Sequence, residues 1–229
     1  TSSTTMRLYL EQIGAIVHKD ITTEIRTREA STAMLVFAVM TIMLFNFALR
    51  LRLDSFKPLV PGILWVTLVF AGTLGLGHSM SAEQVNQCID GLLMSPCDRS
   101  VIFMGKALSN VLFTLLIALI IVPLMAILFD ETLFQPGVLL TVMAGVIGYA
   151  GAGTLIATMA ASTRAREIFL PILLFPLAIP LVVAAVIVTG GFLDQQPFAT
   201  FGSWFGVMVA FAVIFWTAGG LLFDYIVEG

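Results

Sequence analysis

The feature that most constrains this chain is a series of long apolar segments. A helix needs about 20 consecutive apolar residues to cross the hydrocarbon core of a bilayer. Six segments meet this requirement, and they cover residues 30–49, 59–77, 101–128, 134–161, 168–190 and 203–226. Because backbone polar groups in lipid must be hydrogen-bonded within the protein, helices are the favoured way for such segments to span. We therefore predict an all-α integral membrane protein with six transmembrane helices, forming one domain over residues 1–229.

The composition supports this class and excludes others. Hydrophobic residues make up 59% of the chain and charged residues 11%, and the mean hydropathy is +1.04. A water-soluble domain of this length exposes too much surface for such a composition. The net charge is −3 and no basic cluster is present, so we expect a lipid bilayer, and no nucleic acid, as a binding partner.

The lysine and arginine residues predict the orientation in the membrane. Eight of the 11 lie in the N-terminal leader or in or near the second and fourth connections, which share one side if the helices alternate. These eight are Arg7, Lys19, Arg26, Arg28, Arg99, Lys106, Arg164 and Arg166. The other three are Arg50, Arg52 and Lys57. Because Lys and Arg collect in cytoplasmic loops, we predict that both termini are cytoplasmic.

The leader has a helical period of its own. Ile13, Val17, Ile21 and Ile25 recur every four residues and share one helical face. This pattern predicts an amphipathic helix over residues 6–29 that lies in the cytoplasmic interface of the membrane. A plain soluble leader is the alternative.

A second amphipathic pattern lies between the second and third spans. Apolar residues with i, i+3, i+4, i+7 spacing are Val85, Cys88, Ile89, Leu92 and Leu93. Pro96 disfavours helical geometry at Ser95, which ends the pattern. We predict a short cytoplasmic helix over residues 82–96. Such a helix is either a rigid handle that a partner moves or an ordinary loop helix packed on the bundle.

Glycine and proline residues inside the spans lead to two further predictions. Gly145, Gly148 and Gly151 recur every three residues, which indicates close helix packing or a hinge. Three prolines, at positions 171, 176 and 180, predict an irregular fifth span.

No catalytic arrangement is visible in the sequence. His18 and His78 are the only histidines and lie far apart along the chain. Cys88 and Cys97 have neither a metal-binding nor a redox spacing. No phosphate-binding loop is present. We therefore predict no catalytic, cofactor-binding or metal site, and a chain that is not itself an enzyme.

Four segments together resemble the haem exporter protein B (CcmB) family. They read KDITTEIRTRE at 19–29, PGILWVTLVFAGTLGL at 61–76, DGLLMSPCDRSVIFMGKAL at 90–108 and TRAREIFLPILLFPLAIP at 163–180. They occur in the order found in the family and extend over nearly the whole chain. One departure is Gln87, where the family usually has glycine.

The resemblance implies a permease of the short ABC exporter type in the bacterial cytoplasmic (inner) membrane. Such a permease pairs with a second copy of itself and with a separate ABC ATPase subunit that binds ATP. No cofactor is expected on the chain itself, because haem is handled by the complex. The further partners implied are a haem-handling membrane protein and a periplasmic haem chaperone.

The resemblance also implies which residues meet the ATPase. In the family, the helix between the second and third spans is the coupling helix. Carried over to this chain, that role falls on Glu83, Asp90, Gly91, Leu92, Leu93 and Pro96.

The work that the complex performs has two versions. ATP hydrolysis drives either export of haem or release of a haem-loaded chaperone from a partner membrane protein. The lack of paired axial ligands in this sequence favours release. Two other functions are alternatives: export of another amphipathic substrate, such as a lipid-linked glycan or a drug, and a membrane assembly scaffold that performs no transport.

Overall fold

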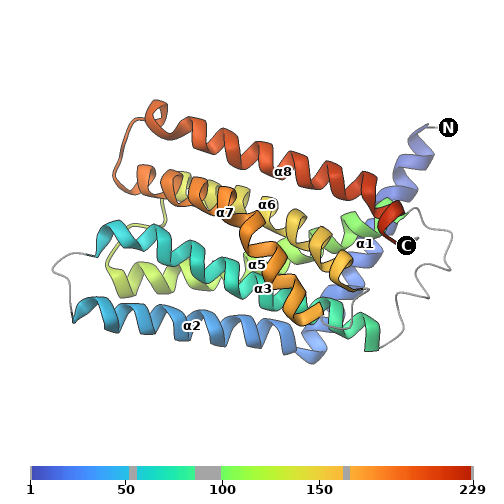
Figure 1. The fold of residues 1–229 in the computed structure, drawn as a ribbon, viewed down its shortest axis with the longest axis horizontal. Coiled ribbons are helices and arrows are strands. Elements are labelled where there is room, and N and C mark those ends of the chain that lie inside the picture. The colour runs from blue at the N-terminus through green and yellow to red at the C-terminus, as the bar shows by residue number, and fades with distance from the viewer. Residues whose placement is uncertain (1, 52–55, 86–98, 162–165, 228–229) are drawn as a thin grey trace.

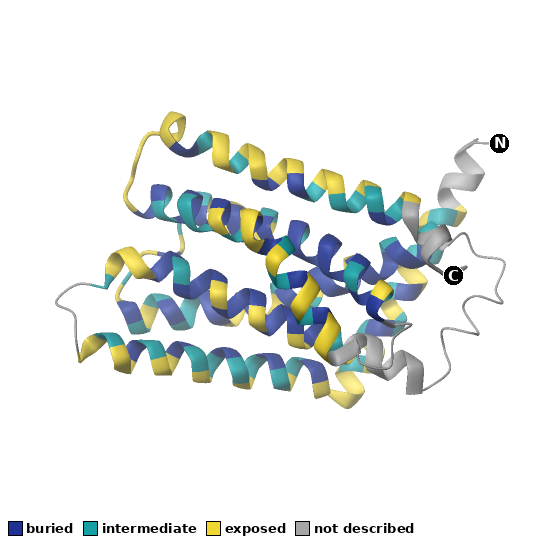
Figure 2. Ribbon diagram, viewed as in Figure 1, coloured by how far each residue is buried: buried dark blue, intermediate teal, exposed yellow. Residues whose placement is uncertain are grey.

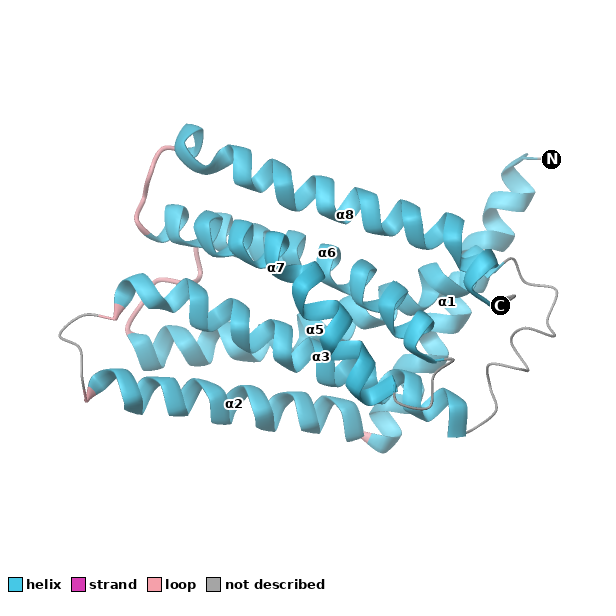
Figure 3. Ribbon diagram, in the orientation of Figure 1, coloured by secondary structure: helices cyan, strands magenta, loops and turns pink. Residues whose placement is uncertain are grey.

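The protein is a bundle of long helices, seen here in a computed structural model that describes residues 2–51, 56–85, 99–161 and 166–227 (Figure 1). Within these ranges every regular element is a helix and no strand occurs (Figure 3). The helices are α1 (Ser2–Thr27), α2 (Glu29–Arg50), the short 3₁₀ helix η1 (Lys57–Leu59), α3 (Val60–Val85), α5 (Arg99–Phe129), α6 (Pro136–Ala161), α7 (Arg166–Leu193) and α8 (Phe198–Val227). The predicted all-α class is confirmed.

Six of the helices, α2 to α8, are long and apolar enough to cross a membrane. Their bounds agree with the predicted spans to within a few residues, apart from two ends. The last helix begins at Phe198, where a turn follows Pro197, rather than at position 203. The second spanning helix, α3, continues unbroken through Val85, so the first residues of the expected coupling helix extend this span.

Successive helices run in opposite directions, so the connections alternate between two ends of the bundle. Both termini, α1, the end of α3 and the start of α5 lie at one end, on the right in Figure 1. The connections from α2 to η1, from α5 to α6 and from α7 to α8 lie at the other end. This arrangement matches the alternation on which the predicted orientation depends.

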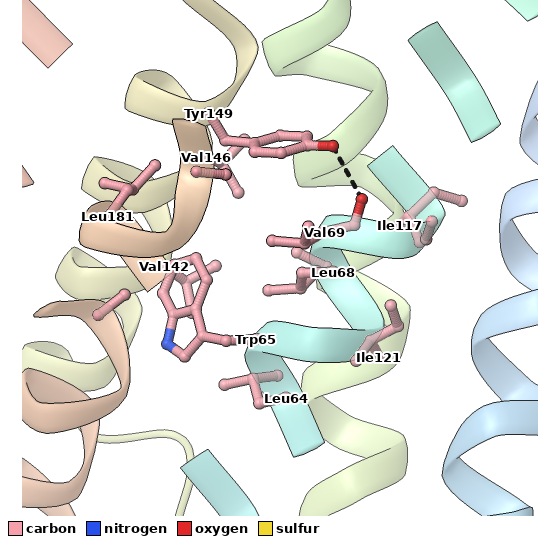
Figure 4. Packing of buried hydrophobic residues seen from close by; sticks show 14 of the residues in the cluster. Leu64, Trp65, Leu68, Val69, Ile117, Ile121, Val142, Val146, Tyr149 and Leu181 are labelled. Carbon is pink, nitrogen blue, oxygen red and sulfur yellow. Dashed lines mark hydrogen bonds between the residues drawn. The ribbon is translucent and has the colours of Figure 1, made fainter. Parts of the chain in front are cut away.

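The core lies between α3, α5, α6 and α7, with α2 and α8 at the flanks (Figure 2). About two thirds of the spanning part of α3 and of α6 is buried, against 22% of α2 and 17% of α8. Figure 4 shows Trp65 and Leu68 of α3 packed against Val146 and Tyr149 of α6 and Leu181 of α7. The exposed faces of the flanking helices are apolar, as a lipid environment requires.

Glycines bring α6 close to its neighbours. A side chain at Gly145 would meet the Trp65 ring, and one at Gly151 would meet the Trp216 ring. Gly148 lies against Leu181 and Phe211. Small residues let helices approach closely in a membrane, so the packing interpretation of these glycines is supported by their contacts.

Several polar side chains inside the bundle are paired with partners on other helices, whereas the buried Thr67 hydroxyl has no partner among the residues that the structure describes. The Tyr149 hydroxyl donates to the Val69 carbonyl at 2.9 Å and lies 2.5 Å from the Thr73 hydroxyl. The Trp65 indole donates to Thr189 at 2.9 Å, and Asn110 donates to Thr154 at 2.9 Å. Because an unpaired polar group in an apolar medium costs several kcal/mol, of order 2–7, these bonds specify which helix faces meet.

The prolines of α7 do not break it into separate helices. The chain is helical from Arg166 to Leu193 with all three prolines inside. Pro176 and Pro180 lie on the exposed side of α7, away from the buried residues Leu174, Ala178 and Leu181. The predicted irregularity is therefore no interruption of the helix.

The contact between Gly145 and Trp65 leads to a stability prediction. Gly145→Ala places a methyl group against a Trp65 ring that is 1% exposed and held by its bond to Thr189. Overpacking of this kind costs about 1–3 kcal/mol, so we expect a lower unfolding temperature of the purified protein in detergent. Gly206→Ala is the matched control, because a methyl group there has open space. Equal unfolding temperatures for both variants would contradict the proposed packing.

Candidate functional site

The candidate site lies at the end of the bundle that holds α1 and both termini (Figure 1). Here α3 ends at Val85 and α5 begins at Arg99. Of the residues predicted to couple to an ATPase, Glu83 lies in the last turn of α3. The others lie outside the described residues: Asp90, Gly91, Leu92, Leu93 and Pro96, together with Gln87.

A sharp corner joins α1 to α2. Arg28 alone separates the two helices and has a left-handed backbone, with φ 56°. The Glu24 carboxylate accepts a hydrogen bond at 2.7 Å from the Ser31 backbone N–H, in the first turn of α2. The first N–H groups of a helix lack intrahelical partners, and a carboxylate there is also favoured by the helix dipole. The hydrogen bond of Glu24 therefore holds α1 and α2 at a defined angle to each other.

On the N-terminal side of this corner, α1 packs across the first two turns of α5. A Cβ atom built at Gly105 would lie 2.9 Å from Cβ of Ile16, so the two helices approach as closely as a glycine allows. The hydroxyls of Tyr9 and Ser100 are 3.1 Å apart and share a hydrogen bond. A small apolar cluster surrounds this crossing, and its buried members are Ile16, Val101, Ile102, Phe103, Ala107 and Leu155.

A buried ion pair lies beside this crossing. The Lys106 ammonium donates to both carboxylate oxygens of Asp20, at 2.8 and 2.9 Å. The two side chains are 4% and 7% exposed. Lys19 approaches the same carboxylate at 3.5 Å but is 41% exposed. Removing one partner of a buried pair leaves an uncompensated charge, which typically costs 3–5 kcal/mol.

The face of α1 that packs on the bundle differs from the apolar face that the sequence pattern predicts for the membrane interface. That pattern groups Ile13, Val17, Ile21 and Ile25, whereas the positions buried against the bundle are Ile16 and Asp20. Ile25 is 64% exposed. Sequence reasoning also missed the ion pair, because an aspartate on the buried face conflicts with a purely apolar stripe. One signal was available: Lys106 lies within an otherwise apolar span, where a charge requires a partner.

At the opposite end of the bundle, basic residues bind groups at and just after the C-terminal end of α5. The Leu128 carbonyl, in the last turn of α5, accepts hydrogen bonds from Asn46 at 2.8 Å and from Arg50 at 2.9 Å. Lys57 lies 3.7 Å from the Glu131 carboxylate. Carbonyls at a helix C-terminus lack intrahelical partners and attract cations. Arg50 and Lys57 therefore each have a structural partner. This explains why two basic residues lie at the end of the bundle that carries fewer positive charges.

The two histidines belong to the α1 end of the bundle. His18 lies in α1 and His78 lies near the end of α3, and both are exposed. Within the residues that the structure describes, no three His, Cys, Asp or Glu side chains form a group that could hold a metal ion. A cavity of about 10 Å³ lies deeper, between Trp65, Thr114, Tyr149 and Leu181. That volume is about the size of one water molecule.

Comparison with models of protein families gives a match that covers most of the chain. The model of the CcmB protein family matches residues 11–219, a range that includes α1 from its middle onwards and nearly all of the six spans. A comparison with curated proteins found no match. With the family model covering most of the chain and six helices able to span a membrane, this protein belongs to the CcmB family, the membrane permeases of an ABC-type haem exporter in cytochrome c biogenesis.

Proposed function

We propose that this chain couples ATP hydrolysis by a separate subunit to the release of a haem-loaded chaperone during cytochrome c maturation. The contact with the ATPase is residues 82–96, and the chain acts beside a haem-handling membrane protein and a periplasmic haem chaperone, with a second copy of itself. Haem export through the permease is the alternative.

The observation that carries the coupling proposal is the place where α3 ends, at Val85, and α5 begins, at Arg99. Both of these helix ends lie at the end of the bundle that also holds α1. Basic residues of α1 and of the first turns of α5 lie at this end, among them Lys19, Arg26 and Lys106. Positive charge favours the cytoplasmic side, which is where an ATPase subunit binds its nucleotide.

One observation favours chaperone release over passage of haem through this chain. The exposed histidines are at the proposed cytoplasmic end, whereas a periplasmic chaperone would receive haem at the opposite end. This placement supports a permease that moves its neighbours while other subunits hold the haem.

Both termini should be cytoplasmic. A reporter fused after Gly229 should show cytoplasmic activity, and one inserted at Gln195, in the turn between α7 and α8, should show periplasmic activity. The physical reason is the excess of basic residues at the α1 end. The measurement is the activity of alkaline phosphatase and green fluorescent protein fusions at both sites. The reverse pair of signals would place residues 82–96 in the periplasm and remove the ATPase contact.

Leu92→Asp should detach or uncouple the ATPase while the bundle stays inserted. A carboxylate placed in an apolar contact costs several kcal/mol, because it loses its hydration without gaining a partner. The measurements are co-purification of the ATPase and the ATPase rate of the complex. Leu51→Asp makes the same chemical change at an exposed position at the other end of the bundle and serves as the control. Full cytochrome c maturation by the Leu92→Asp complex would mean that residues 82–96 are only a loop helix.

Replacing both histidines should leave the function largely intact. If haem is held by other subunits, a chain carrying His18→Ala and His78→Ala loses no axial ligand. We expect cytochrome c levels close to those obtained with the unmodified chain. Haem-stained gels of membranes containing equal amounts of permease provide the measurement. Loss of maturation at equal permease levels would favour direct contact between haem and this chain.

A further inference from the structure

We propose that Asp20 and Lys106 are positioning residues that make α1 and the start of α5 move together. This inference rests on the proposed function, because it concerns how a push on residues 82–96 reaches the rest of the bundle. The ATPase contact itself does not depend on it.

The first step is the position of Lys106. It lies two turns into α5, which begins at Arg99, directly after the connection assigned to the ATPase. A displacement of that connection therefore reaches the first turns of α5 before any other part of this helix. Lys106 is buried there with a side chain that is 4% exposed.

The second step is the rigidity of the α1–α5 crossing. Contacts occur at three levels: Tyr9 with Ser100, Ile16 with Gly105, and Asp20 with Lys106. The first is a single hydrogen bond between partly buried side chains, and the second is non-directional apolar packing. Only the ion pair has two short bonds between buried charged groups. Of the three contacts, it is therefore the one whose separation costs the most free energy.

The third step is the corner at Arg28. Because Glu24 caps the first turn of α2, α1 and α2 are joined with a defined angle. The flanking helix α2 is buried over only 22% of its span and contacts the bundle along one stripe, Ala30, Met34, Ala38, Ile42 and Asn46. A movement of α1 is therefore passed directly to α2, at the edge of the bundle. The ion pair connects α5 to α1 and so links α5 to this movement.

Lys106→Met is the first test, in the complex with its ATPase in native membranes. We expect the ATPase to stay bound and to hydrolyse ATP at near the normal rate, while cytochrome c maturation falls about tenfold, a size typical of coupling between sites. The decisive quantity is cytochrome c matured per ATP hydrolysed. Lys57→Met, which removes an ion pair with a 48% exposed lysine, is the matched control and should leave this ratio unchanged.

A rescue variant separates positioning from simple stability. Exchanging the charges, with Asp20→Lys and Lys106→Asp together, should restore most of the ratio, because the ion pair forms again with the two charges reversed.

The outcomes distinguish this inference from the proposed function. If the unmodified chain does not bind an ATPase, the proposed function fails. If the unmodified complex is intact but Lys106→Met leaves the ratio unchanged, the positioning role is wrong. It is also wrong if ATPase binding, ATPase rate and maturation all fall in parallel, because the pair then serves only stability. Failure of the charge exchange to restore the ratio, with the double variant present in the membrane at normal levels, would likewise overturn it.

Discussion

The structure depends on one constraint, the absence of water as a hydrogen-bonding partner inside a bilayer. A polar group that enters the span is stabilised only by a partner within the protein, and most of the buried polar side chains that the structure describes have one, the Thr67 hydroxyl excepted. The carbonyl of Leu128 therefore takes Asn46 and Arg50, and Tyr149 takes the Val69 carbonyl. The same constraint explains why Lys106, inside an apolar helix, is met by a carboxylate from a different helix. In this protein the apolar contacts fill the interfaces between helices, and the few polar contacts select which helix faces meet.

Packing in the centre of the bundle follows from the pairing of glycines with large rings. The helix α6 offers glycines to Trp65 on α3 and to Trp216 on α8, and each indole donates a hydrogen bond across a helix interface, Trp65 to Thr189 and Trp216 to the Ile147 carbonyl. These contacts hold α3, α7 and α8 against α6 by directional bonds as well as by apolar packing.

Much of this fold was predictable from the sequence, because transmembrane helices are defined by length and apolarity alone. The spans at 30–49 and 101–128 correspond closely to α2 and α5. The continuation of α3 to Val85 was not predictable, since the polar residues after His78 resemble a connection. The Asp20–Lys106 pair was also missed: its members are 86 positions apart, and a local period carries no information about a distant partner. The coupling residues were identified by resemblance, and they remain a prediction.

The distance between Asp20 and Lys106 along the chain has a consequence for biosynthesis. At bacterial elongation rates of roughly 5–20 residues per second, the lysine is made about 4–17 seconds after the aspartate. During that interval the two spanning helices α2 and α3 are synthesised, while the carboxylate of α1 still lacks its buried partner. The packing of α1 on α5 is therefore completed only after the start of the third span has been made. Assembly of this protein ends, at least for α1, with a step that joins the first segment made to a later one.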